Sequence, residues 1–184
     1  MILFAACSSI DVALTKGSLP EFDRIAVLPF TVKNASWGDE FTDSVQAQLM
    51  KQTGTTVVER AQLKKILKEQ QMSQSGLVDD SSAVNIGRLL NVKYIIVGTG
   101  TALKGRSDQN LIDTFSLKIL DVETGAVVMN IRKEPGTEWT PWLRTKYTMG
   151  FFYFWTRKEI FLESSTYDHI AKQMVLRIAE NLKK

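Results

Sequence analysis

Few side chains in this sequence have the types and spacing that catalysis or metal binding requires. The chain contains one histidine, His169, and one cysteine, Cys7, which is too few for a thiolate zinc site or an internal disulfide. A Ser-His-Asp triad would depend on His169, and no G-x-S-x-G turn occurs. Asp79 and Asp80 are the nearest pair of carboxylates, and capping of a helix explains them better than acid–base catalysis. We therefore predict a protein that is not an enzyme and that holds neither a metal nor a cofactor.

The glycines at positions 98 and 100 do not indicate a nucleotide-binding loop. A dinucleotide fingerprint needs a third glycine and a helix that starts at the loop, whereas this segment continues with strand-forming residues. Small residues inside a strand often mark a place where another part of the backbone approaches closely. We expect that role for Gly98 and Gly100.

Cys7 lies in a sequence that suggests a specific chemical modification. Residues 1–6 are apolar and end in two alanines, and Ser8 and Ser9 follow the cysteine. This pattern resembles the end of a bacterial lipoprotein signal, with the basic segment missing and the apolar run short, as in a truncated reading frame. Acyl chains on Cys7 would anchor the chain to a membrane, and serine after the cysteine resembles sorting to the outer membrane. The alternative is an apolar N-terminus in which the cysteine is incidental.

Length and composition indicate one globular domain. The 184 residues suffice for a proper core, and 44% hydrophobic with 23% charged residues is ordinary for such a domain. No apolar run reaches the roughly 18 residues that suggest a transmembrane helix. The net charge of +3 is small and scattered, so we expect no nucleic acid among the partners.

The first half of the chain alternates between short strands and amphipathic helices. Residues 24–30 are almost continuously apolar, which predicts a strand buried on both faces. Ser36 to Asp39 fits a capping box that opens a helix, and Gly54 ends this helix. Residues 55–58 form the next strand. The core positions of the helix recur every four residues: Phe41, Val45 and Leu49.

Two more helices and a strand follow. The first of these helices turns its apolar face inward and its lysines outward. The second begins at Asp80-Ser81 and contains Gly87, which suggests a close packing contact because glycine costs about 1 kcal/mol against alanine in a helix. Residues 92–103 then form a strongly β-prone strand. The expected core residues of the two helices are Leu63, Ile66, Leu67, Ala83, Ile86 and Leu90.

The last third of the chain contains a hairpin and a final helix. Apolar and polar residues alternate over 115–119 and 127–131, and Gly125 lies in the short turn between them. The final helix begins near Ser165, with Asp168 at its capping position. The resulting order is β-α-β-α-α-β-β-β-α. It predicts an α/β fold with a mixed sheet flanked by helices.

A combination of five segments resembles one known family. The chain contains, in this order, RIAVLPF, FTDSVQAQLMKQ, TTVVERAQLKKILKEQ, VKYIIVGTGT and LKILDVETGAVV. Together they resemble the CsgG family, which includes the curli secretion lipoprotein of the outer membrane, over about 23–132 and the final helix. The resemblance implies a CsgG-like α/β domain at 23–184, preceded by a truncated signal and tether at 1–22. It also implies a lipid-anchored outer-membrane protein that faces the periplasm.

For the curli member, the resemblance further implies a ring-shaped export channel with two membrane-spanning β-hairpins per subunit. A spanning strand takes about 9–11 residues with alternating apolar side chains. Residues 104–110, at the place of the first hairpin, are too few and too polar to enter a bilayer. The sequence therefore departs from the pore-forming pattern at this position.

An aromatic-rich hairpin or loop insertion at about 134–164 precedes the last helix. The stretch 139–161 holds three of the chain's 4 Trp, two of its 4 Tyr and four of its 9 Phe residues. Trp and Tyr beside Arg and Lys suit a membrane interface, and aromatic patches are also common hot spots of protein interfaces. An insertion folded onto the domain, or a buried contact between subunits, explains the pattern as well. The candidate interface or membrane-contact residues are Trp139, Trp142, Tyr147, Phe151, Phe152, Tyr153, Phe154 and Trp155.

These features predict a protein that works by binding other proteins. The leading interpretation is an assembly or secretion accessory at the outer membrane, with other envelope proteins or further copies of itself as partners. The alternative is an LpoB-like interaction lipoprotein that regulates a cell-wall synthase. Such a regulator usually has a long tether, and residues 8–21 are short for that purpose.

Overall fold

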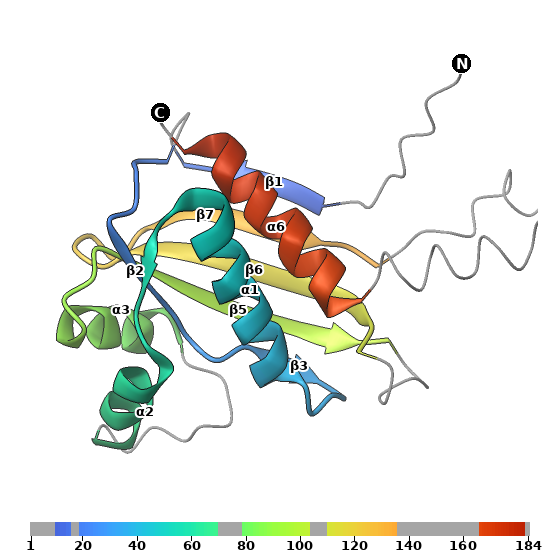
Figure 1. The fold of residues 1–184 in the computed structure, drawn as a ribbon, viewed down its shortest axis with the longest axis horizontal. Coiled ribbons are helices and arrows are strands. Elements are labelled where there is room, and N and C mark those ends of the chain that lie inside the picture. Colours follow the sequence, from blue (N-terminus) through green and yellow to red (C-terminus); the bar gives the residue numbers. More distant parts are fainter. Residues whose placement is uncertain (1–9, 16–18, 70–78, 104–109, 136–165, 183–184) are drawn as a thin grey trace, which may run out of the picture.

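The computed structural model describes residues 10–15, 19–69, 79–103, 110–135 and 166–182, which build a seven-stranded mixed sheet with helices on both faces (Figure 1). The predicted α/β class is confirmed. In spatial order the strands are β1 (Ile10–Leu14), β7 (Val127–Lys133), β6 (Ile112–Asp121), β5 (Tyr94–Ala102), β2 (Arg24–Val27) and β4 (Thr56–Val57), and β3 (Thr31–Lys33) also pairs with β5. The helices are α1 (Gly38–Thr53), α2 (Arg60–Glu69), α3 (Asp80–Leu89) and α6 (Tyr167–Asn181).

The sheet has a parallel part and an antiparallel part. β2 runs parallel to both β4 and β5, and β3 is also parallel to β5. From β5 onward, β6, β7 and β1 pair in antiparallel fashion. Parallel neighbours need a crossover connection, so the parallel part coincides with the early strand–helix alternation. The antiparallel part contains the hairpin, whose turn includes Gly125 at a φ of 72°, as the sequence predicted.

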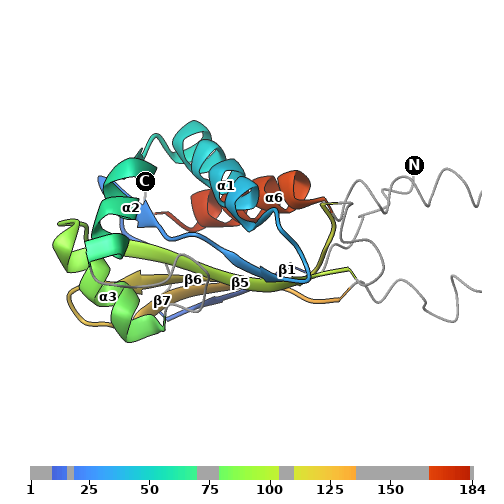
Figure 2. The same ribbon diagram turned by 90° about the horizontal axis from the view of Figure 1, so that it is seen from below.

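Helices α1 and α6 lie side by side on one face of the sheet (Figure 2). The predicted apolar stripe of α1 is confirmed, because Phe41, Val45 and Leu49 are fully buried. Helix α6 contributes side chains at four-residue steps to the same core, which is the spacing of one face of a helix. These are Ile170, Met174 and Ile178.

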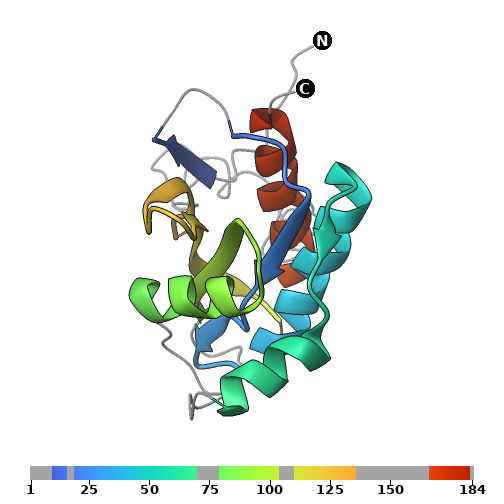
Figure 3. The same cartoon turned by 90° about the vertical axis from the view of Figure 1, so that its left-hand side faces the viewer.

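Helices α2 and α3 pack a second, smaller core on the opposite face, and Figure 3 shows α3 and α6 on opposite sides of the sheet. Leu63 and Leu67 are buried as predicted, whereas Ile66 is half-buried. Gly87 also has its predicted role. A Cβ atom there would lie 2.5 Å from Cγ2 of Val122, so only glycine lets α3 approach the end of β6 this closely.

Three predicted helix caps are wrong by one or two residues. Ser36 does not cap α1, since the capping residue is Trp37 and no side chain makes a capping bond. Helix α3 is capped by Asp79, which accepts a hydrogen bond from Ser82 N–H at 2.7 Å, and not by Asp80. In α3 and α6, tertiary contacts occupy the side chains that were expected to cap. Asp80 pairs with Lys118, and Asp168 accepts a hydrogen bond from Ser44 while Thr166 caps α6.

Two strands were not predicted. Residues 8–21 were expected to form a tether, but residues 10–14 of that stretch are β1, which pairs with β7 at the end of the sheet. The short strand β3 extends the parallel part beyond β2. β1 could have been found from its alternation, since Ile10, Val12 and Leu14 are apolar and lie on one face.

We expect Leu67→Ala to lower the free energy of unfolding by about 2–5 kcal/mol, because removal of a buried leucine side chain leaves a cavity. Leu67 is 2% exposed in the core between α2, α3 and the sheet. The neighbouring Lys68→Ala, on the exposed side of α2, is the control and should change stability little. A urea titration measures both. A loss of less than roughly 0.5 kcal/mol for Leu67→Ala would contradict the assigned helix face.

Candidate functional site

The site residues proposed from sequence lie outside the described residues. This holds for Cys7 and for the aromatic candidates Trp139, Trp142, Tyr147, Phe151, Phe152, Tyr153, Phe154 and Trp155. The described residues on either side of them establish where on the domain these segments begin and end. The site is therefore built from those flanking residues.

The flanking residues meet at one end of the sheet. Ile10 at the start of β1 pairs with Lys133 at the end of β7. Thr166, which precedes α6, forms a bridge with Leu111 at the start of β6. Backbone bonds from Tyr167 N to Asn110 O at 2.9 Å and from Leu103 N to Leu111 O at 3.1 Å join the same corner. We call this end the insertion pole, defined by Ile10, Lys133, Leu111 and Thr166.

Aromatic side chains form the core next to the insertion pole. Phe41 of α1 packs edge-on against Phe115 of β6 at a centroid distance of 4.7 Å, and against Phe30 at 5.3 Å. Trp37 stacks at a tilt on Tyr167 with centroids 5.3 Å apart. Aromatic pairs in such geometries contribute about 0.5–1.5 kcal/mol beyond their buried area. The cluster therefore holds the starts of α1 and α6 firmly on the sheet beside the insertion.

Gly98 and Gly100 of β5 make room for these rings. A Cβ atom at Gly98 would lie 2.5 Å from Cζ of Phe115 and 2.6 Å from Cδ1 of Phe30. At Gly100 it would collide with the carbonyl oxygen of Thr114 and with the Phe115 ring. The close backbone approach predicted from sequence thus occurs at Gly100, and the aromatic packing is an additional reason that the sequence did not reveal.

Tyr167 lies where the insertion returns to the domain. Burial raises the pKa of its hydroxyl, and the nearby carboxylates of Asp168 and Glu40 raise it further. The hydroxyl therefore stays neutral at physiological pH and acts as a hydrogen-bonding group. Trp37, at 8% exposure, has an indole Nε1 without a hydrogen-bond partner in the described part of the chain.

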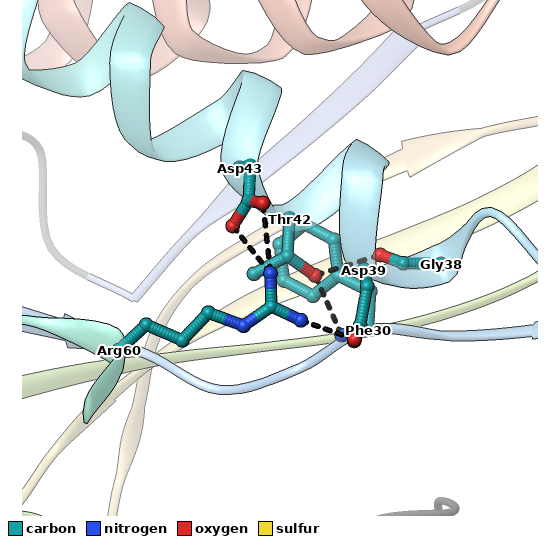
Figure 4. A network of polar contacts seen from close by, with 6 residues as sticks. All are labelled: Phe30, Gly38, Asp39, Thr42, Asp43 and Arg60. Atoms are coloured by element: carbon teal, nitrogen blue, oxygen red, sulfur yellow. Dashed lines mark hydrogen bonds and ion pairs between the residues drawn. The ribbon is translucent and has the colours of Figure 1, made fainter. Parts of the chain in front are cut away.

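A polar network fixes the start of α1 (Figure 4). The buried hydroxyl of Thr42 accepts a hydrogen bond from Phe30 N at 2.9 Å and donates one to the carbonyl of Gly38 at 2.8 Å. Arg60 at the start of α2 reaches Asp43 with its Nη1 at 2.7 and 2.9 Å and also pairs with Asp39. The two terminal nitrogens of the guanidinium thus bind different carboxylates, Nη1 that of Asp43 and Nη2 that of Asp39, which defines its orientation. The network therefore ties α2 to α1 across the edge of the sheet.

The charged residues at the insertion pole also have hydrogen-bond or ion-pair partners within the domain. Lys133 is only 6% exposed, and its Nζ donates to the carbonyls of Asp113 at 2.7 Å and Glu134 at 3.3 Å. Arg132 pairs with Glu134 at 2.6 Å. A buried ammonium group is tolerated only when such acceptors replace water. These bonds rigidify the strand end from which the insertion leaves.

The two carboxylates weighed for catalysis have structural roles, and His169 takes part in a helix cap through its backbone. Asp79 caps α3, and the Ser82 N–H that it accepts lowers its pKa. Asp80 forms an ion pair with Lys118 at 2.8 Å, and the backbone N–H of His169 donates to the Thr166 cap. Within the described ranges, no group of three His, Cys, Asp or Glu side chains could hold a metal ion. No helix in the same ranges has the length and apolarity to cross a membrane.

Residues 22–110 match the family model described as "Curli production assembly/transport component CsgG". Over these residues, just under half of its length, the chain is similar to the CsgG family. The match runs from just before β2 to just before β6, and so it includes the aromatic cluster residues Phe30, Trp37 and Phe41. No curated protein matches the sequence significantly.

Solved structures share the fold of this chain at low sequence identity. The C-terminal domain of LpoB from Salmonella enterica aligns at 16% identity over 62% of this chain and 82% of its own, with a TM-score of 0.51. LpoB from Escherichia coli aligns at 17% identity over 63% and 56%, also with a TM-score of 0.51. The PelC dodecamer from Paraburkholderia phytofirmans covers 95% of this chain and 99% of its own at 12% identity, with a TM-score of 0.48. The LpoB alignments indicate a common fold.

Thr42→Val should lower the free energy of unfolding by about 1–3 kcal/mol, because it leaves the buried Phe30 N–H without an acceptor. Thr42→Ser is the matched control, since it keeps the hydroxyl and loses only a methyl group. Both can be measured by urea denaturation followed by circular dichroism. Equal stability of the two variants would mean that the hydroxyl does not hold α1 on the β2–β3 connection.

Proposed function

We propose that this protein is a CsgG-like outer-membrane lipoprotein that faces the periplasm and acts as an assembly or secretion accessory through protein–protein contacts. One observation carries the proposal: the segments with Cys7 and with the aromatic candidates both adjoin the insertion pole. The match of residues 22–110 to the CsgG family model supports it. No catalytic step is part of the proposal, since Asp79 caps α3 and Asp80 pairs with Lys118.

The spacing between Cys7 and β1 determines how far the domain can lie from the membrane. Only Ser8 and Ser9 separate the cysteine from Ile10, the first residue of β1. Even a fully extended link of this length spans roughly 10 Å. A lipidated Cys7 would therefore keep the insertion pole close to the membrane surface.

The same geometry determines where the aromatic insertion is attached to the domain. It leaves the domain after β7 and returns at Thr166, so both of its attachment points are at the pole nearest the anchor. Burial of each large aromatic ring contributes about 1.5–3 kcal/mol. A few rings on one surface can therefore dominate association with a neighbouring subunit, an envelope protein or the bilayer surface.

An LpoB-like regulator of a cell-wall synthase is the second candidate, and the fold shared with LpoB favours it. The short link between Cys7 and β1 argues against it, because a regulator that reaches across the periplasm needs a long tether. Gel filtration and negative-stain microscopy of the detergent-extracted protein separate the two. A ring of several copies supports the secretion-type function, and a monomer supports the regulator.

Cys7→Ser should release the protein from the membrane fraction when the chain is expressed behind a complete lipoprotein signal, because the acyl chains can no longer be attached. Ser9→Ala, which keeps the cysteine, is the control and should remain in the membrane. Fractionation and intact-mass measurement check both variants. Membrane retention of Cys7→Ser, together with no lipid mass on the wild-type cysteine, would rule out the anchor.

Simultaneous substitution of Phe151, Tyr153 and Trp155 by serine should abolish assembly or membrane association while the α/β domain stays folded. The reason is that these rings supply apolar area beyond what the described core uses. The control is Met50→Ser with Leu89→Ser, which removes the large hydrophobic side chains that are 57% and 55% exposed elsewhere on the described surface. Circular dichroism, thermal melting and an assembly assay are the measurements.

Two outcomes of this experiment contradict the proposal in different ways. If the triple variant unfolds, the three rings belong to the core of the domain. If it folds and assembles like the wild type, the interface lies elsewhere on the molecule.

A further inference from the structure

β1 ends the sheet and has an open outer edge in the described part of the chain. It pairs with β7 on one side, and no described strand pairs with it on the other. At the opposite end of the sheet, β4 is two residues long and contacts α1. β3 has three residues and ends in the exposed Lys33. Among the described strands, β1 therefore offers the longest edge at which another strand could be added.

One backbone hydrogen bond shows which residues of β1 direct their N–H and C=O groups toward β7 and which direct them away from it. Thr15 N donates to Val128 O at 3.1 Å, so residue 15 directs its backbone groups toward β7. In an antiparallel pair this direction alternates from residue to residue. The regular register from Ile10 to Leu14 keeps that alternation intact. The N–H and C=O groups of Ile10, Val12 and Leu14 thus point away from β7, into the open edge.

The side chains of β1 also suit an added strand. Ile10, Val12 and Leu14 are half-buried against the main core, whereas Asp11 and Ala13 are exposed on the other face. Natural edge strands are usually protected by proline, lysine, a bulge or a covering element. β1 has no proline or lysine and no register shift, and its single charge, Asp11, points to one face of the sheet and not along its edge.

We propose that the outer edge of β1 binds an extended segment of a partner protein by β-strand addition. Main-chain hydrogen bonds to Ile10, Val12 and Leu14 supply the affinity. The partner segment has about five residues that alternate between apolar and polar. Its apolar side chains continue the half-buried row of Ile10, Val12 and Leu14, and its polar side chains lie beside Asp11 and Ala13.

A second copy of this chain fits the edge less well. Symmetric pairing of β1 with β1 is antiparallel, so it places the two insertion poles at opposite ends of the joined sheet. Links of roughly 10 Å could then hold both copies in one membrane only if the joined sheet lay along the membrane surface, and not with both insertion poles directed at it. This step rests on the proposed anchor at Cys7. A continuous ring of sheets would need a second long edge, and β3 and β4 are too short to provide one.

Val12→Pro tests the proposal in the full chain. It removes an outward N–H without touching the bonds to β7, and proline is tolerated at edge positions whose N–H faces away from the sheet. Val12→Thr is the matched control, because it keeps the N–H and nearly the same side-chain shape. The probe is a fluorescent synthetic peptide with the alternating sequence Lys-Val-Thr-Val-Thr-Val-Lys.

Fluorescence anisotropy should show saturable binding of the peptide to wild type and to Val12→Thr, and a loss of at least about tenfold for Val12→Pro. Amide hydrogen exchange of the wild-type protein with and without peptide should show new protection at Ile10, Val12 and Leu14, but not at Asp11 and Ala13. This exchange measurement needs no variant, so it remains decisive if Val12→Pro fails to fold.

Three results would overturn the proposal. The first is that the peptide does not bind the wild type saturably. The second is that a folded Val12→Pro variant binds the peptide as well as the wild type does. The third is that the peptide gives no new exchange protection to the amides of Ile10, Val12 and Leu14. Sedimentation that reveals a wild-type dimer dissolved by Val12→Pro would assign the edge to a second copy instead. The proposed lipid anchor is tested separately, because membrane fractionation and the lipid mass on Cys7 are measured without the peptide.

Discussion

The packing of Phe41 is the interaction on which the rest of the structure depends. This ring is fully buried and contacts Phe115 of the sheet, Phe30 before β3, Trp37 at the start of α1 and Tyr167 at the start of α6. It therefore joins the sheet to both helices of one layer at a single point. Gly98 and Gly100 are required beneath the cluster because any larger side chain would occupy the space of the Phe115 and Phe30 rings.

This arrangement makes one end of the domain rigid where the chain leaves it. The insertion departs from a strand end held by Lys133 and returns to a helix capped by Thr166. The Thr42 and Arg60 networks fix α1 and α2 beside that end. When the base is already rigid, only the attached segment has to lose conformational entropy as it binds its partner. Such a base suits a segment that acts through contacts and not through chemistry.

The two proposed surfaces are compatible in space. β1 starts at the insertion pole and runs away from it along the edge of the sheet (Figure 1). A segment added to β1 would lie beside the sheet and leave the insertion pole uncovered. The chain could therefore be held at a membrane by one end while its edge strand binds an extended segment of a periplasmic protein.

Local periodicity in the sequence was enough to predict the α/β class, the stripe of Phe41, Val45 and Leu49, and the hairpin around Gly125, because the spacing of apolar residues reports which side of an element faces a core. The lipoprotein-like pattern around Cys7 and the concentration of aromatic residues before the last helix also identified candidate sites, which the described residues do not test. Tertiary structure decided the caps of α3 and α6, since Asp80 and Asp168 bind Lys118 and Ser44 from distant parts of the chain. It likewise decided that residues 10–14 join the sheet as an open edge, because strand pairing depends on β7, more than a hundred residues away.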